Sequence, residues 1–187
     1  MPDGLYDGFE VDMLSVGNAD CILVTSWSQG TAVRVLIDGA GVGAAQDVLT
    51  FLRENDISYI DHLVSTHPHD DHAGGLLELV KDPDVNVGKA WMHLPWNHFD
   101  SQEVASALKK SAGLAVVMEI QKSLTRVTSL YSELQKRGIG IEEPFQGKNI
   151  GFFKVCGPSQ SYFEELVGGF ANIEQLSQRS NPLGKYD

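Results

Sequence analysis

The chain has 187 residues, 42% of them hydrophobic, and a formal net charge of −11 at pH 7. This length and composition are typical of one globular unit, so we expect residues 1–187 to form a single domain around one principal core. The acidic balance disfavours broad binding to a nucleic-acid backbone, and without an export signal or an apolar stretch of roughly 20 residues we expect a cytoplasmic protein with no membrane partner.

Strands and helices are expected to alternate along the chain. Period-two alternation of apolar residues predicts strands over 9–16, 19–25, 32–38, 59–66, 85–94 and 150–156. Helical spacing predicts helices over 44–55, 72–81, 101–110 and 114–137, followed by an acidic helix that contains Glu164 and Glu165. This order is that of an α/β protein.

The longest predicted helix, 114–137, has an apolar stripe and a charged face. The stripe is most simply a core-facing surface, and its residues recur every three or four positions: Ile120, Leu124, Val127, Leu130 and Leu134. The charged face includes Lys122, Arg126 and Lys136. A solvated surface is the ordinary explanation for such charges, and a partner surface or a substrate lid is the alternative.

The segment between strand 59–66 and helix 72–81 concentrates side chains that bind metals. His67 and His69 are two residues apart, so in extended backbone both rings point the same way and can bind one cation. Asp71 and His72 project from the first helical turn, where they could hold a second cation. Imidazole and carboxylate donors without thiolate suit zinc, manganese or iron. The sequence therefore predicts a site for two divalent metal ions.

A simpler explanation is that the histidines only satisfy the loop, while Asp70 or Asp71 caps the helix. We favour the metal site because several ionisable groups in one turn would otherwise each need a separate partner. Two ions roughly 3.5–4 Å apart can share a water and lower its pKa toward neutrality, which would supply a hydroxide nucleophile. Ala73, Gly74 and Gly75 leave room for this loop to pack closely against its neighbours.

The pattern H-x-H-x-D-H, filled by His67, His69, Asp71 and His72 and followed by Ala-Gly-Gly, resembles the signature of the metallo-β-lactamase superfamily. The strand pair 9–16 and 19–25, the strand 33–39 ending in Asp-Gly, and the helix 44–55 agree with this family in order and spacing. The stretch 16–21, Val-Gly-Asn-Ala-Asp-Cys, is most similar to the subgroup that contains the hydrolase domain of competence-type DNA-internalisation proteins.

The resemblance implies a role for each residue of the motif. His67 and His69 would bind the first metal, and Asp71 and His72 the second, with Asp71 also orienting the attacking water. Asp38 would lie beneath them and accept a hydrogen bond from a ligand imidazole. The alternative for Asp38 is an ordinary turn residue before Gly39 and Gly41.

The resemblance also implies an αββα sandwich, of which only the N-terminal half to two-thirds would be present here. Members of the family draw further ligands from the second half, an aspartate that bridges the metals and a histidine near the carboxyl terminus. After His98 the chain has no histidine, and its only later aspartates are Asp100 and Asp187. We therefore expect a chain that is incomplete at its carboxyl end.

Four other residues are weighed for metal binding. His93 and His98 could substitute for a missing ligand, although a packed strand end with a loop histidine is the simpler expectation. Cys21 and Cys156 lie in apolar strand-like contexts, and we expect buried free thiols that are neither disulfide-bonded nor zinc ligands.

The leading functional hypothesis is a metal-dependent hydrolase in which a metal-bridged hydroxide attacks an ester, amide or phosphodiester. The substrate would be a small molecule or a phosphodiester. The competence-type resemblance favours a nucleic acid, against which the net charge argues. Two alternatives remain open at this point: a non-catalytic metal-binding interaction module that lacks the distal ligands, and a diiron redox protein of the same superfamily.

Overall fold

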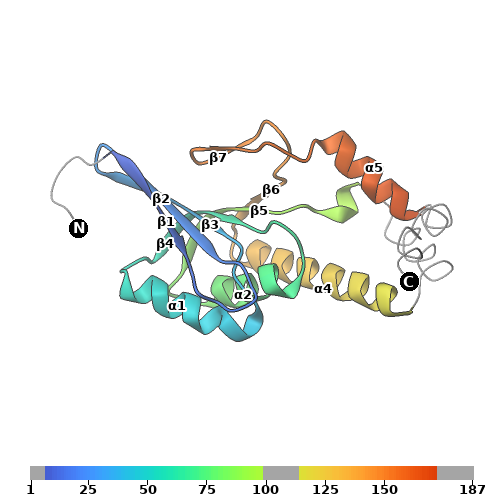
Figure 1. The fold of residues 1–187 in the computed structure, drawn as a ribbon, viewed down its shortest axis with the longest axis horizontal. Helices are drawn as coiled ribbons and strands as arrows, with labels where there is room; N and C mark the ends of the chain where they lie inside the picture. Colours follow the sequence, from blue (N-terminus) through green and yellow to red (C-terminus); the bar gives the residue numbers. More distant parts are fainter. Residues whose placement is uncertain (1–6, 99–113, 172–187) are drawn as a thin grey trace, which may run out of the picture.

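A six-stranded sheet forms the centre of the protein in the computed structural model, which describes residues 7–98 and 114–171 (Figure 1). The strands lie side by side in sequence order from β1 to β6. The first three are antiparallel, and β3 to β6 are parallel. The strands are β1 (Gly8–Met13), β2 (Ile22–Ser28), β3 (Thr31–Ile37), β4 (Tyr59–Val64), β5 (Asn86–Trp91) and β6 (Gly140–Glu142).

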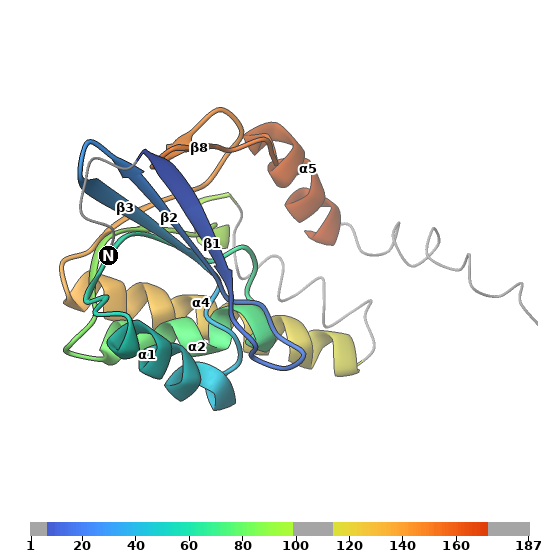
Figure 2. The ribbon, with the colours of Figure 1, turned by 60° about the vertical axis from the view of Figure 1, so that its left-hand side comes forward.

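Helices in the crossovers between the parallel strands cover one face of this sheet. Figure 1 and Figure 2 show α1, α2 and α4 together on that face. β3 is followed by η1 (Val42–Ala44) and α1 (Ala45–Glu54), β4 by α2 (Asp70–Lys81), and β5 by η2 (Pro95–Asn97) and later α4 (Leu114–Lys136). The order confirms the α/β class expected from the alternation of strands and helices.

The main core lies between the sheet and these helices. Leu36 of β3 and Leu63 of β4 occupy neighbouring positions in register, and both are about 1% exposed. The apolar stripe of α4 faces the same core, because Val127, Leu130 and Leu134 are buried. Burial of apolar side chains at this scale, about 1.5–3 kcal/mol for each large residue, holds α4 on the sheet.

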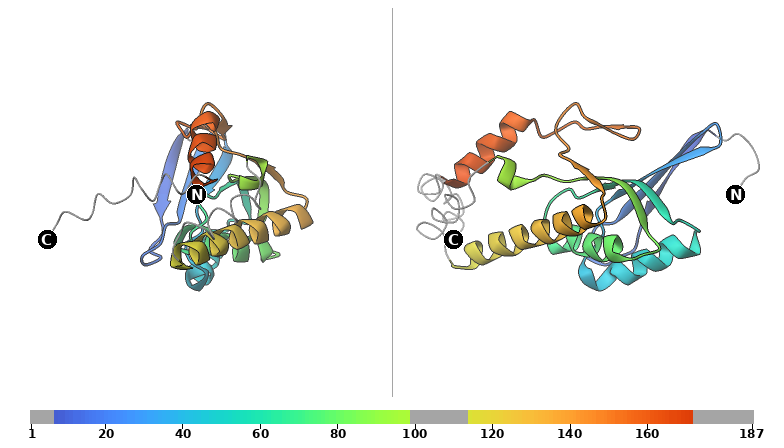
Figure 3. Two further views of the ribbon diagram at one scale, coloured as in Figure 1. Left: turned by 90° about the vertical axis from the view of Figure 1, so that its right-hand side faces the viewer. Right: turned by 180° about the vertical axis from the view of Figure 1, so that it is seen from behind.

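The opposite face of the sheet has a smaller cover. A two-stranded hairpin, β7 (Asn149–Ile150) and β8 (Phe153–Lys154), is followed by α5 (Gln160–Ala171), and Figure 3 shows α5 across the sheet from α4. A second core on this side is formed by Val35, Val64, Trp91 and Ile150. The edge strand β1 leaves Phe9 71% exposed on this face.

Several sequence expectations are wrong or fall outside the described residues. The segment 150–156 is not one strand, because Gly151 takes a left-handed φ of +55° and turns the chain between β7 and β8. As a result Cys156 is exposed rather than buried. The short β6 was not expected from the sequence. The expected helix over 101–110 lies outside the described residues, and within them no helix is long and apolar enough to span a membrane.

Candidate metal centre

The histidine-rich loop follows β4 at the carboxyl edge of the sheet. The neighbouring strand β3 ends just before Asp38, so both connections leave the sheet side by side. The backbone N–H of Asp38 donates to the carbonyl of Val64 at 2.8 Å, and the N–H of Gly39 donates to the carbonyl of His72 at 2.7 Å. These bonds fix the first turn of α2 against the end of β3. Sites are commonly built at such carboxyl ends of parallel strands.

Asp38 is the buried centre of the hydrogen-bond network beneath the loop. It is 3% exposed, and its backbone takes a left-handed φ of +58°, which aspartate adopts more readily than most residues. Its Oδ1 accepts the backbone N–H of Thr66 at 2.9 Å. Its Oδ2 lies 2.6 Å from the hydroxyl of Thr66 and 2.9 Å from Nδ1 of His72.

The ionised carboxylate of Asp38 decides where the protons on its neighbours lie. A carboxylate can only accept, so the Thr66 hydroxyl and Nδ1 of His72 must both donate to it. Because the single hydroxyl proton of Thr66 is then used, its oxygen can only accept from Nδ1 of His67, 3.0 Å away. Both imidazoles therefore carry their proton on Nδ1 and present the lone pair of Nε2, which is the form that binds a metal.

We use the term metal-loop cluster for His67, His69, Asp71 and His72 together with Asp38. The structure brings these side chains together in two overlapping groups, within each of which the candidate ligand atoms all lie within 4.8 Å of one another. One group is His67, His69 and Asp71, and the other is Asp38, His67 and His72. His67 is shared between them. The expected pairs also lie close together, since His67 and His69 share one group and Nε2 of His72 lies 3.6 Å from Oδ2 of Asp71.

The donors in this cluster fit a divalent cation. The ring centroids of His67 and His72 are 3.9 Å apart, and those of His67 and His69 are 4.9 Å apart. Such crowding would repel if the rings were charged. Burial lowers the pKa of His67, and the neighbouring imidazoles of His72 and His69 lower it further. The lowered pKa favours the neutral form of His67, which metal ligation requires.

Small residues let α2 approach the end of β3 closely enough to form this cluster. A Cβ at Gly75 would lie 1.9 Å from the carbonyl oxygen of Gly39, and a Cβ at Gly39 would lie 2.6 Å from the backbone nitrogen of Leu76. Neither distance can be accommodated without moving backbone. The N–H of Gly75 uses the close approach to donate to the carbonyl of Ala40 at 2.8 Å.

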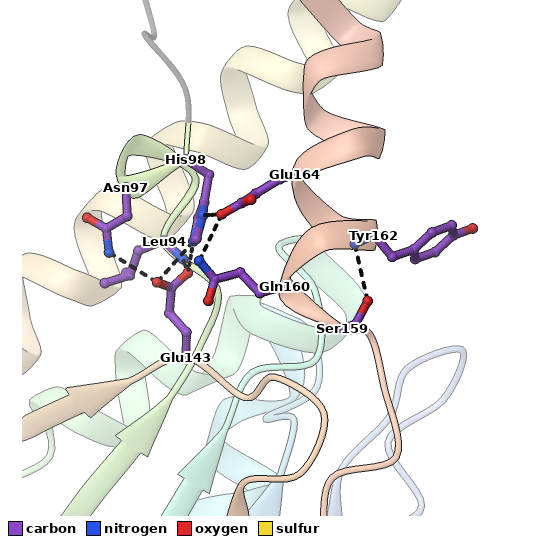
Figure 4. A network of polar contacts seen from close by, with 8 residues as sticks. All are labelled: Leu94, Asn97, His98, Glu143, Ser159, Gln160, Tyr162 and Glu164. Carbon is purple, nitrogen blue, oxygen red and sulfur yellow. Dashed lines mark hydrogen bonds and ion pairs between the residues drawn. The ribbon is translucent and has the colours of Figure 1, made fainter.

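His93 and His98 lie in a different setting, shown in part in Figure 4. His98 is 5% exposed and bridges two carboxylates, with Nε2 at 2.9 Å from Glu143 and Nδ1 at 3.0 Å from Glu164 of α5. We call these three residues the His98 cluster. The ring of His93 stacks on Phe163 of α5, with centroids 4.6 Å apart. Neither histidine joins a metal-donor group among the described residues, which favours the packing explanation for both.

The two cysteines differ in surroundings. Burial, with a further contribution from the nearby Asp38 carboxylate, raises the pKa of Cys21 to about 12. Its thiol therefore stays protonated at neutral pH, and a thiolate ligand is not available there. Both cysteines are free, as the sequence predicted.

Two residues of the site were not assigned a role there from the sequence. Thr66 links Asp38 to His67, and its place directly before the first motif histidine was the available signal. Arg126 of α4 contacts the loop through the carbonyl of Pro68 at 3.1 Å and the carboxylate of Asp70 at 2.7 Å. The expectation of a solvated Arg126 was therefore wrong, and only the tertiary structure brings Arg126 and Asp70 together.

Residues 14–150 match the family model of the metallo-beta-lactamase superfamily, and this span contains the whole metal-loop cluster. The chain belongs to the metallo-β-lactamase superfamily. The family typically binds divalent metals and is usually hydrolytic. Together with the candidate ligands, membership supports a hydrolase-type function that depends on metal.

Two individual proteins are similar to this chain. A thioesterase, pkgB of Emericella nidulans, is 44% identical over 62 residues, which are 31% of this chain and 18% of that protein. The match thus spans less than a fifth of the curated relative. A Thermotoga maritima protein of known crystal structure aligns over 76% of this chain and 61% of its own length, at 14% identity and a TM-score of 0.40.

Proposed function

We propose that this protein is a metal-dependent hydrolase, with His67, His69, Asp71 and His72 as metal ligands and Asp38 as their positioning group. The observation that carries the proposal is the network around Asp38. It directs the Nδ1 protons of His67 and His72 toward the protein interior and leaves both Nε2 lone pairs for a cation.

The cofactor would be two divalent ions, zinc by preference with manganese or iron as substitutes. Such ions polarise a scissile carbonyl or phosphoryl group and lower the pKa of water, so that it becomes a nucleophile at neutral pH. The chain's own residues would hold the ions and orient the attacking water. Asp71, with its side chain 52% exposed, lies at the open side of the cluster, where its carboxylate can accept a hydrogen bond from the attacking water.

The substrate class that we favour is a small ester or thioester. The partial likeness to a thioesterase supports this class, and the net charge of −11 supports a small substrate over a polynucleotide. No activated serine or cysteine nucleophile is needed, because water is the attacking group. Cys21, whose pKa is raised by burial and by the nearby Asp38 carboxylate, stays an unreactive thiol.

A second candidate substrate is a phosphodiester, which the competence-type resemblance of residues 16–21 favours. The backbone N–H of Asp20 in this stretch donates to the carbonyl of Asp71 at 3.1 Å, and the Asp20 carboxylate lies 3.5 Å from Nδ1 of His72. The stretch thus packs against the metal-loop cluster. Two divalent cations would reverse the local charge enough to hold one phosphodiester group.

The test is metal analysis combined with a substrate panel on the full chain. We expect about two divalent ions per chain and hydrolysis of a thioester or aryl ester ahead of a bis-aryl phosphodiester. His69→Ala should lower metal content and turnover together, and His62→Ala is the matched control. His62 lies on the other face of the sheet, where its Nδ1 accepts the indole N–H of Trp91 at 3.2 Å.

Other outcomes would replace the proposal. Bound zinc without turnover on any member of the panel would favour a non-catalytic metal-binding module. Stoichiometric iron with a visible absorption band and no hydrolysis would favour a diiron redox protein. Full turnover in His69→Ala would remove the motif from the mechanism altogether.

A further inference from the structure

Arg126 contacts the histidine loop on both sides of His69. Its side chain reaches from α4, 58 residues after Pro68 in the sequence, and one terminal nitrogen donates to the Pro68 carbonyl at 3.1 Å. The other terminal nitrogen pairs with Oδ1 of Asp70 at 2.7 Å. Pro68 separates His67 from His69, and Asp70 follows His69. One guanidinium therefore spans the peptide segment that sets the spacing of the two imidazoles.

The geometry of this contact restricts the loop more than a single hydrogen bond would. Proline has no N–H, so in the middle of the His-Pro-His segment the carbonyl is the only polar backbone group that Pro68 offers. A planar guanidinium that binds two acceptors fixes direction as well as distance. Arg126 is only 23% exposed. The same Oδ1 of Asp70 also lies close to Gly74, where a Cβ would come within 2.7 Å of it.

A second arginine, Arg137, directly follows the last residue of α4 and provides an internal comparison. Arg137 follows Arg126 by about three helical turns and lies on nearly the same face of the helical path. Its guanidinium donates to backbone carbonyls at the far end of α2, including those of Val80 and Asp82, and to that of Val85 at 2.9 Å. Arg126 of α4 and Arg137 just after it thus bind opposite ends of α2, but only Arg126 touches the segment that carries candidate ligands.

We propose that Arg126 is a positioning residue for the metal site: it holds Pro68 and Asp70 so that His67 and His69 are presented together to the cation. The inference rests on the proposed metal ligands. It predicts that the contact contributes to metal affinity and to the geometry of the bound metal, beyond any contribution to the docking of α4 on α2. Arg137 makes the docking contribution alone.

The experiment measures metal binding rather than turnover. Wild type, Arg126→Met, Arg126→Lys and Asp70→Asn are titrated with Zn²⁺ in competition with a chelating dye, and their Co²⁺ forms are compared by visible absorption. Arg137→Met is the matched control, and thermal unfolding of all metal-free proteins measures the structural cost. Asp70→Asn changes an exposed side chain, so it keeps the test valid if Arg126→Met folds poorly.

We expect Arg126→Met to weaken Zn²⁺ binding by about 10-fold or more, which is typical of lost outer partners of a metal site, and to shift the Co²⁺ spectrum. Arg126→Lys and Asp70→Asn should show a smaller change in the same direction. Arg137→Met should lower the melting temperature and leave affinity and spectrum unchanged. The inference is overturned if wild type binds metal and Arg126→Met matches it in both readouts. If wild type binds no metal, the proposed function fails first.

Discussion

Two regions of this protein combine histidine with carboxylate, and they use the imidazole nitrogens in opposite ways. In the metal-loop cluster, His67 directs Nδ1 toward Thr66 and His72 directs Nδ1 toward Asp38, while Nε2 of His72 lies 3.6 Å from Oδ2 of Asp71. In the His98 cluster, both ring nitrogens lie against carboxylates, Glu143 on one side and Glu164 on the other. The first arrangement leaves one ring nitrogen able to bind a metal, whereas in the second both ring nitrogens are already paired with carboxylates.

The difference teaches that residue type alone does not distinguish a metal site from a structural ion pair. Both clusters contain partly buried imidazoles and at least one carboxylate within hydrogen-bonding distance. What separates them is the number of ring nitrogens that the protein itself satisfies. A ring with one satisfied nitrogen is oriented and still able to bind a ligand, whereas a ring with two satisfied nitrogens fastens one element to another. In the second case the fastened element is α5.

The largest expected effect comes from replacing His67, the residue shared by both donor groups. His67→Ala should lower metal affinity by at least about 100-fold, beyond the loss typical of an outer partner, because it removes a ligand from each group. Metal content after gel filtration, measured by mass spectrometry, checks this. His98→Ala, measured in parallel, should keep the wild-type metal content. Equal losses of metal content in both variants would contradict the distinction between the metal-loop cluster and the His98 cluster.

A smaller effect is expected from Asp38→Asn. The asparagine amide can itself donate to the Thr66 hydroxyl or to Nδ1 of His72, both of which donate to the Asp38 carboxylate in the wild type. The Nδ1 protons of His67 and His72 are then no longer fixed. We expect a loss of about 10- to 100-fold in metal affinity. Asp61→Asn is the control, because Asp61 also accepts a backbone N–H, that of Arg34 at 2.8 Å, from the neighbouring strand. Isothermal titration should show unchanged affinity for the control alone.

The His98 cluster should respond in stability instead of metal binding. His98→Ala removes one of the hydrogen-bond partners of the partly buried Glu143 carboxylate, and we expect a loss of about 1–3 kcal/mol in the free energy of unfolding. Urea denaturation of the metal-free protein measures it. Hydrogen exchange would sharpen the result, since protection should fall in α5 before it falls in α2. A uniform loss over both helices would mean that His98 does not fasten α5 in particular.

The smallest expected effect is on the pH dependence of folding stability. Burial lowers the pKa of His93 below its ordinary value of 6.5, with Glu143 opposing the shift. The unfolded chain therefore takes up a proton first as the pH falls through 6.5, and the fold loses stability by at most about 1.4 kcal/mol per pH unit for this group. His93→Phe should keep the stacking on Phe163 and flatten the decline between pH 7 and pH 5.5 in urea denaturation. An unchanged slope would contradict the assignment. His62 and His67, whose pKa values are also lowered by burial, should leave a residual slope.

The sequence by itself determined the class of fold and the set of candidate ligands. Alternating strands and helices follow from local periodicity, and the stripe of α4 was readable because residues three and four apart share a helical face. The motif at 67–72 was readable for a similar reason, since all its donors lie within one loop and one turn. Asp38 was reached only through the resemblance, because it lies 34 residues from His72 along the chain.

Tertiary structure decided everything that depends on contacts between distant segments. The proton positions on His67 and His72 follow from Asp38 and Thr66, which meet only where β3 and β4 end side by side. The role of Arg126 depends on how α4 lies along α2. The pairing of both ring nitrogens of His98 depends on α5 lying beside the segment that follows β5. Local patterns report which face of an element is apolar. They do not report which polar group on another element will be in reach, because that is set by how the elements pack.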